Sequence, residues 1–233
     1  MSGLITAGIV GTPPLDLGAT PSTTAQFSPG TVVTSSDPNH GGGRFIYAKC
    51  AAAQAVGALC AVSGAGTTPV MTAVANTANL GVPLFVARQT FTAADQYGWY
   101  QIDGLCPIVS NATVAVGSSL GITAAGTAGT LAAGKQILGV VVAASQTGTI
   151  TKTGTTTNGS KQVTVGDVDG VWVGQAVTGT GIAGSSTVAS IGGNNVINLN
   201  NAATATGTVT LTFTYTGFTL VRMTAPNAQG AIT

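Results

Sequence analysis

The sequence contains very few charged residues. Only 6% of its 233 residues are charged, glutamate is absent, and all six acidic residues are aspartates. Soluble domains usually carry about 25% charged residues. Because the formal net charge is only +1, the chain lacks the basic field that binding to nucleic acid or to an anionic membrane requires. So little charge promotes association, and we expect neighbouring subunits to cover much of the surface, although solvated Thr, Ser and Asn side chains would explain part of this composition.

Long hydrophobic runs and paired cysteines are also missing. The most apolar segment, Ile137–Ala144, is far shorter than the roughly 20 residues of a membrane-spanning helix, and its valines favour a buried strand. The three cysteines, Cys50, Cys60 and Cys106, form no CxxC pair. Such an odd, widely spaced set favours buried, reduced thiols, which fits assembly in a cytoplasm.

Catalytic and ligand-binding motifs are weak. Gly179–Gly184 fits the dinucleotide pattern GxGxxG, but no helix-forming segment follows it and no acidic residue occurs after Asp169, so a glycine-rich turn is the preferred interpretation. The pair Asp167 and Asp169 lacks the later glutamate ligand of a calcium loop. His40 is the only histidine, and no cysteine lies at a zinc-binding spacing from it. We therefore predict no catalytic residue, no cofactor and no metal ion.

Two carbohydrate-related arrangements stay open at the level of sequence. Asp95 and Asp103 lie close together within one expected sheet, as the paired carboxylates of a glycoside hydrolase would. Trp99, Tyr97 and Tyr100 are candidates for a sugar-stacking platform, although packing in a core or between subunits is the preferred interpretation.

Strand signals run through most of the chain. Within residues 82–109, Val82–Ala87 is a short apolar run, Trp99–Ile102 alternates large apolar and polar groups, and Asp103-Gly104 favours a tight reversal. From Thr149 to Thr214 the chain becomes rich in Thr, Gly and Asn, with strand runs, Val171–Val177 among them, at a spacing of roughly ten residues. Phe218–Met223 returns to the earlier composition. The sequence therefore predicts an all-β protein with an inserted domain.

Composition also predicts the domain boundaries. Five of the nine prolines fall within residues 1–44, which opposes regular structure, so we expect an extended N-terminal arm with one short strand near Phe27–Thr34. Residues 45–148 and 217–225 are expected to form a β-barrel, β-tulip-like or sandwich body. Residues 149–216 would form a second, small β domain, and residues 226–233 a loose tail. The apolar residues of the arm that we predict to contact a partner are Ile5, Val10, Leu15, Leu17 and Phe27.

Several segments, taken in order, resemble head decoration (cement) proteins of tailed bacteriophages. They are Arg44–Tyr47, Ala55–Gly57, Gly81-Val82, Tyr97–Gly104 and Lys135–Val140, and the resemblance covers roughly residues 44–147 and 218–225. Residues 154–182 and 207–213 resemble a small β module common in phage virion proteins. The resemblance implies an all-β protein on the outer face of an icosahedral head, often trimeric, and it implies no particular functional residues.

From the composition and the resemblance together we expect a structural virion protein that is not an enzyme. It would be assembled in the host cytoplasm, bind the outer surface of the phage head and stabilise the lattice of the major capsid protein. It would associate with itself, as a homotrimer rather than a dimer, and would bind neither nucleic acid nor membrane. The alternatives are another virion component, such as a tail or head-fibre subunit, and a carbohydrate-binding module.

Overall fold

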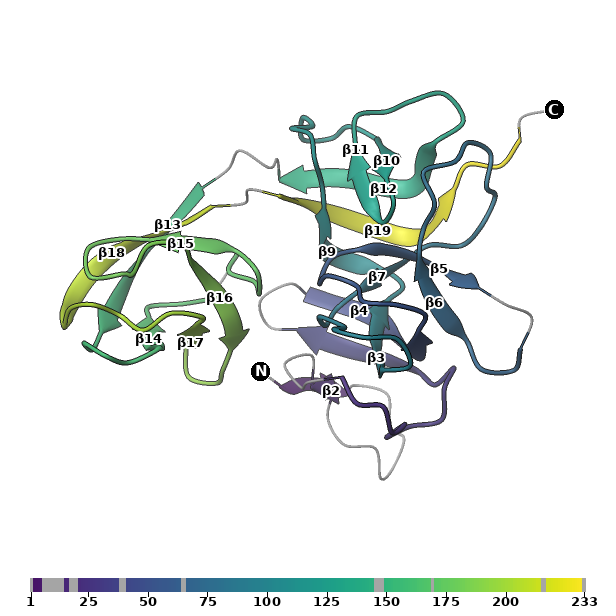
Figure 1. Ribbon diagram of the computed structural model, residues 1–233. Coiled ribbons are helices and arrows are strands. Elements are labelled where there is room, and N and C mark those ends of the chain that lie inside the picture. The colour runs from purple at the N-terminus through teal and green to yellow at the C-terminus, as the bar shows by residue number, and fades with distance from the viewer. Residues whose placement is uncertain are drawn as a thin grey trace. The chain divides into compact units, whose positions relative to one another are not determined.

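The computed structural model describes residues 2–5, 15–16, 21–37, 41–63, 66–144, 149–168, 170–214 and 217–231, and its regular elements there are all strands (Figure 1). The predicted all-β class is therefore confirmed. Among these residues no helix is long and apolar enough to cross a membrane. The chain divides into two compact units, which we call the body (Ser2–Gln146 and Gly217–Thr233) and the inserted barrel (Thr147–Thr216). The sequence predicted this inserted domain at residues 149–216.

The first sheet of the body has eight strands in the order β2-β1-β3-β4-β6-β5-β7-β8, and β4 also pairs with β8. This additional pairing closes β4, β6, β5, β7 and β8 into a ring. Within the ring the β4–β6 pair is parallel and the other pairs are antiparallel. The strands are β1 (Ser2–Ile5), β2 (Leu15–Asp16), β3 (Val32–Asp37), β4 (Gly41–Cys50), β5 (Leu59–Ser63), β6 (Val70–Ala73), β7 (Phe85–Ala87) and β8 (Tyr97–Gln101).

The second sheet of the body has five antiparallel strands in the order β11-β10-β12-β19-β9. Its longest strand, β19, is drawn in yellow in Figure 1 because it comes from the end of the chain, after the inserted barrel. The strands are β9 (Gly104–Val109), β10 (Leu120–Ala124), β11 (Thr127–Gly129), β12 (Gln136–Ala144) and β19 (Phe218–Ala228).

Three buried clusters stabilise the body, and one of them groups Val33 with the aromatic residues Phe45, Tyr47 and Trp99. Another joins ring residues such as Leu59 and Val86 to Ile108 and Val221 of the five-stranded sheet. The third fills the ring with mainly small side chains. Small inward-facing residues allow a short ring of strands to close without overpacking. The members of this third cluster are Ala48, Cys50, Ala58, Cys60, Met71, Ala87, Phe91 and Tyr100.

The inserted barrel is a closed six-stranded barrel in the order β13-β14-β17-β16-β15-β18. Strict alternation in Gln162–Val165 buries Val163 and Val165 and exposes the residues between them. The expected strand Val171–Val177 is wrong in its first half, because Gly174 has φ +90° and Val171 N donates to Val168 O in a turn. The strands are β13 (Thr149–Thr156), β14 (Gln162–Val165), β15 (Ala176–Thr178), β16 (Ser186–Ile191), β17 (Val196–Leu199) and β18 (Gly207–Thr214).

The N-terminal region differs from the expected extended arm. The strand expected near Phe27–Thr34 runs over Val32–Asp37 and pairs with β4, and together with β1 and β2 it extends the eight-stranded sheet. The glycine-rich Gly41–Gly43 belongs to β4, although its composition opposes a regular element. A glycine is needed there, because a Cβ on Gly43 would lie 2.6 Å from the carbonyl oxygen of Asp103.

The C-terminal region is also more ordered than expected. The predicted loose tail was 226–233, but β19 continues to Ala228, which pairs with Ile137. Leu84 N donates to the carbonyl oxygen of Pro226, and Gly230 forms a bridge with Leu80. These contacts tie the end of the chain to the segment that precedes β7.

Candidate interaction surface

The residues predicted to contact a partner fall into three groups. Ile5 lies in β1 and Leu15 in the edge strand β2, whereas Val10 and Leu17 lie outside the described residues. Phe27 packs against the body, with its ring centroid 5.2 Å from that of Tyr47 and 5.3 Å from that of Trp99. Phe27 therefore helps to cover its own sheet.

The aromatic residues considered as a sugar platform are largely buried. Trp99 is 5% exposed and packs on Tyr47 at a centroid distance of 5.1 Å. Tyr100 is fully buried inside the ring, where it stacks on Phe91. Tyr97 is half-buried and stacks on Tyr47 at a centroid distance of 6.1 Å. Since sugar stacking needs an open aromatic face, Trp99 and Tyr100 do not offer a platform.

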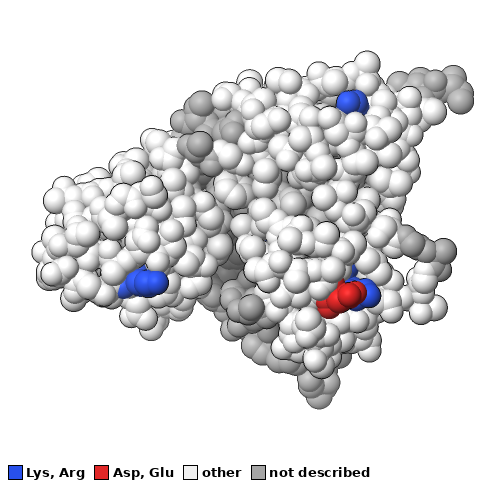
Figure 2. Space-filling model, viewed as in Figure 1, with Lys and Arg blue, Asp and Glu red and all other residues white. Residues whose placement is uncertain are grey.

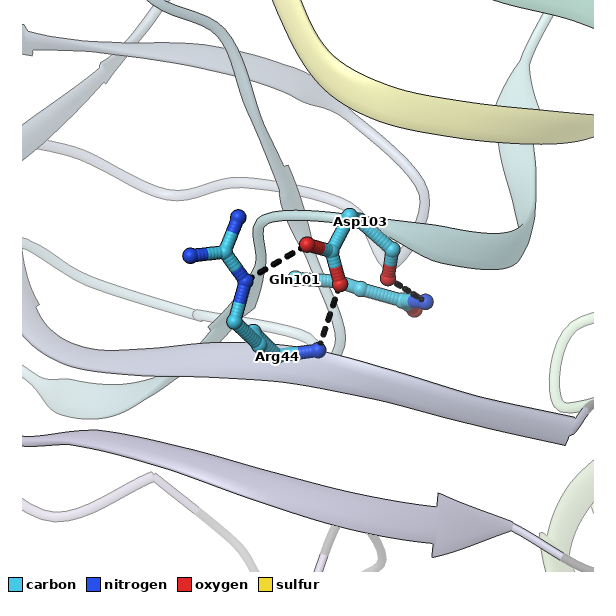
Figure 3. Close-up of polar contacts among 3 residues, drawn as sticks. All are labelled: Arg44, Gln101 and Asp103. Atoms are coloured by element: carbon cyan, nitrogen blue, oxygen red, sulfur yellow. Dashed lines mark hydrogen bonds and ion pairs between the residues drawn. The ribbon is translucent and has the colours of Figure 1, made fainter.

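The two aspartates considered as paired carboxylates each form an ion pair with a different strand residue. Asp103 accepts from Arg44 Nε at 2.6 Å and from Arg44 N at 2.8 Å, while Gln101 Nε2 donates to the carbonyl oxygen of Asp103 at 2.8 Å (Figure 3). Asp95 accepts from Lys49 Nζ at 2.7 Å. The Asp103 contacts fasten the turn between β8 and β9 to β4, which indicates a structural role for this carboxylate.

The remaining sequence motifs do not assemble a site. Gly179–Gly184 forms a turn between β15 and β16, with Gly181 at φ +74°. Asp167 pairs with Lys152, and His40 and Asp169 lie outside the described residues. No group of three or more His, Cys, Asp or Glu residues that would hold a metal ion occurs among the residues that the structure describes.

A polar network centred on Gln54 occupies the interior of the ring. The Tyr100 hydroxyl donates to Gln54 Oε1 at 2.8 Å, and Cys60 Sγ lies 3.4 Å from the same oxygen. Gln54 Nε2 donates to the carbonyl oxygen of Met71 at 2.9 Å. Because buried polar groups need partners, this network fixes how β5, β6 and β8 meet.

Because its cysteine thiols are buried, the body should lose stability at alkaline pH. Burial raises the pKa of the Cys60 thiol from 9.0 to about 12 and raises the pKa of Cys106 as well. The Cys60 thiol loses its proton near pH 9 in the unfolded chain, whereas in the folded chain it stays protonated. The contribution of this thiol to the stability of the fold is therefore complete below pH 9 and is lost as the pH rises toward 12. We expect the free energy of unfolding to fall over this window by about 1.4 kcal/mol per pH unit for Cys60.

Urea titrations of the wild type and of Cys60→Ala between pH 7 and pH 11 would check this dependence. The variant should be less stable at pH 7, because it loses buried volume, and its stability should decrease less steeply above pH 9. Equal slopes for the two proteins would contradict the assignment.

The five-stranded sheet carries apolar side chains on the face that points away from the core. The strand predicted over Ile137–Ala144 is confirmed and is buried on one face, through Ile137, Val140 and Val142, but Leu138 is 44% and Val141 48% exposed. Val116, in the loop before β10, is 64% exposed, and its neighbour Gly117 donates to the carbonyl oxygen of Val142. We call Leu138 and Val141, together with the exposed Arg222 that pairs with Val141 in register, the outer face.

Sequence reasoning missed the outer face for a specific reason. A run such as Ile137–Ala144 is apolar at every position, so periodicity does not show which residues are covered. The isolated Gly139 was the available signal, because a glycine within a strand often marks a bulge or a close backbone approach.

Charged side chains are few and scattered on the face of the molecule that Figure 2 shows. The aspartates whose side chains are described, Asp95, Asp103 and Asp167, are each paired with a lysine or an arginine. Where the structure describes the side chains, the surface therefore offers other molecules hydroxyl, amide and apolar groups rather than free carboxylates.

No protein-family model, curated protein or solved structure matches this chain.

Proposed function

We propose that this chain is a structural virion protein that decorates the outer surface of a tailed-phage head and stabilises the lattice of the major capsid protein. The observation that carries the proposal is the outer face, where Leu138 and Val141 are about half exposed on a surface with little charge. Clustered exposed apolar side chains mark interaction surfaces, and a low-charge surface favours association. Both features suit a protein that works while held among other subunits.

The resemblance of residues 44–147 and 218–225 to head decoration proteins supports the capsid as the partner. Self-association as a trimer fits the same role, since linked weak contacts gain affinity through multivalency. Contacts through Ile5, Val10, Leu15 and Leu17 stay predictions, because they concern side chains that the structure does not describe.

Co-sedimentation with undecorated capsids, assembled from the cognate major capsid protein, tests the proposal. The chain should sediment with the capsids, saturate at a fixed ratio to the capsid subunits and raise the temperature at which the capsids disassemble. Analytical ultracentrifugation of the free protein should give three times the mass of one chain. A chain that stays in the supernatant at every concentration would refute the proposed function.

Another virion location is the second candidate, because the small β module that residues 154–182 and 207–213 resemble is common among phage virion proteins generally. Electron microscopy of virions with an antibody against the inserted barrel separates the two: label over the head supports decoration, and label confined to the tail supports a tail subunit.

A further inference from the structure

A bulge between β12 and β19 opens a groove on the outer face. Leu138 pairs with Asn227 and Val140 pairs with Met223, so the single residue Gly139 on β12 lies opposite three residues, 224–226, on β19. The groove has a volume of about 300 Å³. Its lining includes Ser119, Gln136, Leu138, Val141, Arg222 and Thr224.

The groove combines apolar walls with hydrogen-bonding groups at its edges. Leu138 and Val141 expose nearly half of their surface there, and covering them would remove apolar area from water. Gln136, Ser119 and Thr224 contribute amide and hydroxyl groups. Apolar contact area with a few polar groups that orient the ligand is typical of a binding groove.

Arg222 is the charged residue of this groove, and it has no acidic neighbour within its own sheet. The sequence contains no Asp or Glu between Asp103 and Asp167, nor after Asp169, so strands β9–β12 and β19 carry none. Within the described part of the chain, no ion pair or side-chain hydrogen bond involves Arg222. Its five guanidinium donors are suited to a carboxylate in the fork geometry that arginine favours.

Charge also bears on whether a second copy of this chain or a different protein occupies the groove. The aspartates whose side chains the structure describes, Asp95, Asp103 and Asp167, are in a second copy already paired with that copy's own cations. Sharing one of them with Arg222 would compete with an existing pair. A different protein that carries a free carboxylate beside an apolar side chain avoids this competition, so charge complementarity favours it.

We propose that the groove between β12 and β19 binds an acidic, apolar segment of the major capsid protein, with Arg222 holding its carboxylate and Leu138 and Val141 covering its apolar side chain. This inference rests on the proposed function, which supplies the capsid as the partner. It assigns the face of the body that meets the capsid. It also makes the contact depend on one cation in an otherwise charge-poor surface.

Two pairs of matched variants test the groove in the capsid co-sedimentation assay. Arg222→Glu reverses the cation in the groove, and Lys161→Glu makes the same charge change at an exposed lysine of the inserted barrel. Val141→Ser truncates the exposed valine of β12, and Val62→Ser truncates a valine of β5 that is 46% exposed. Thermal unfolding and ultracentrifugation of each variant accompany the binding measurements.

We expect Arg222→Glu to weaken capsid binding at least about tenfold, since losing a paired charge at an interface costs at least 1.4 kcal/mol, and Val141→Ser to weaken it severalfold. Lys161→Glu and Val62→Ser should bind as the wild type does. If all four variants bind capsids as the wild type does, the groove is not the capsid-binding site, and the proposed function is left intact. Wild-type protein that does not bind capsids would overturn both. Loss of self-association in Val141→Ser or Arg222→Glu would show that the groove binds a second copy, which also overturns the proposal.

Discussion

Replacing Phe213 with alanine should lower the free energy of unfolding of the inserted barrel by about 3–5 kcal/mol. Phe213 is fully buried in a cluster formed by valines, isoleucine and leucine from the barrel strands. Truncation loses the transfer free energy of the ring and leaves a cavity, because a closed barrel has little freedom to collapse around it. The loss is large against the roughly 5–15 kcal/mol of total stability that a small domain has.

Differential scanning calorimetry of the whole chain measures this effect. The inserted barrel and the body are separate compact units, so we expect two transitions, of which Phe213→Ala lowers only the one that belongs to the barrel. Thr210→Ala on the same strand, at an exposed position, is the control and should change stability by less than about 0.5 kcal/mol. A single transition that shifts as a whole would show that the two units unfold together.

Replacing Gly139 with alanine should destabilise the body by about 2–4 kcal/mol. Gly139 has φ +71°, a conformation that costs an L-residue roughly 1–2 kcal/mol. A Cβ there would also lie 2.4 Å from the carbonyl oxygen of Thr224. Because that atom belongs to the backbone of the paired strand, the bulge between β12 and β19 has to shift to relieve the contact.

Gly117→Ala is the matched control for the carbonyl contact. Gly117 also has a positive φ, +83°, but an added Cβ there would meet nothing within 4 Å. Its substitution should therefore cost only the conformational part, about 1–2 kcal/mol. Denaturant titrations of both variants measure the difference, and equal losses would mean that the Thr224 contact carries no energy.

The local sequence was sufficient for the fold class and for the existence of a second domain. Alternation in Gln162–Val165 places valines on one face of a strand. The change to a Thr-, Gly- and Asn-rich composition near Thr149, and its reversal at Phe218, marked an insertion that the structure places at Thr147–Thr216. These features depend on neighbouring residues, so they can be read directly from the chain.

The local sequence did not indicate which strands pair with each other or which face of a strand is covered. The ring closes because β4 pairs with β8, about fifty residues later, and strand periodicity carries no information about the partner. The same limit applies to Gly41–Gly43, which is a strand only because β3 and the Asp103 turn lie beside it.

A charge-poor, all-β chain with an inserted domain follows from the amino-acid sequence alone, because composition and alternation are local properties. The outward orientation of Leu138, Val141 and Arg222 around a groove depends instead on how the strands pair and pack. In a strand that is apolar at every position, the neighbouring elements that pack on it determine which face is buried. The bulge at Gly139 then determines which side chains of β12 remain exposed.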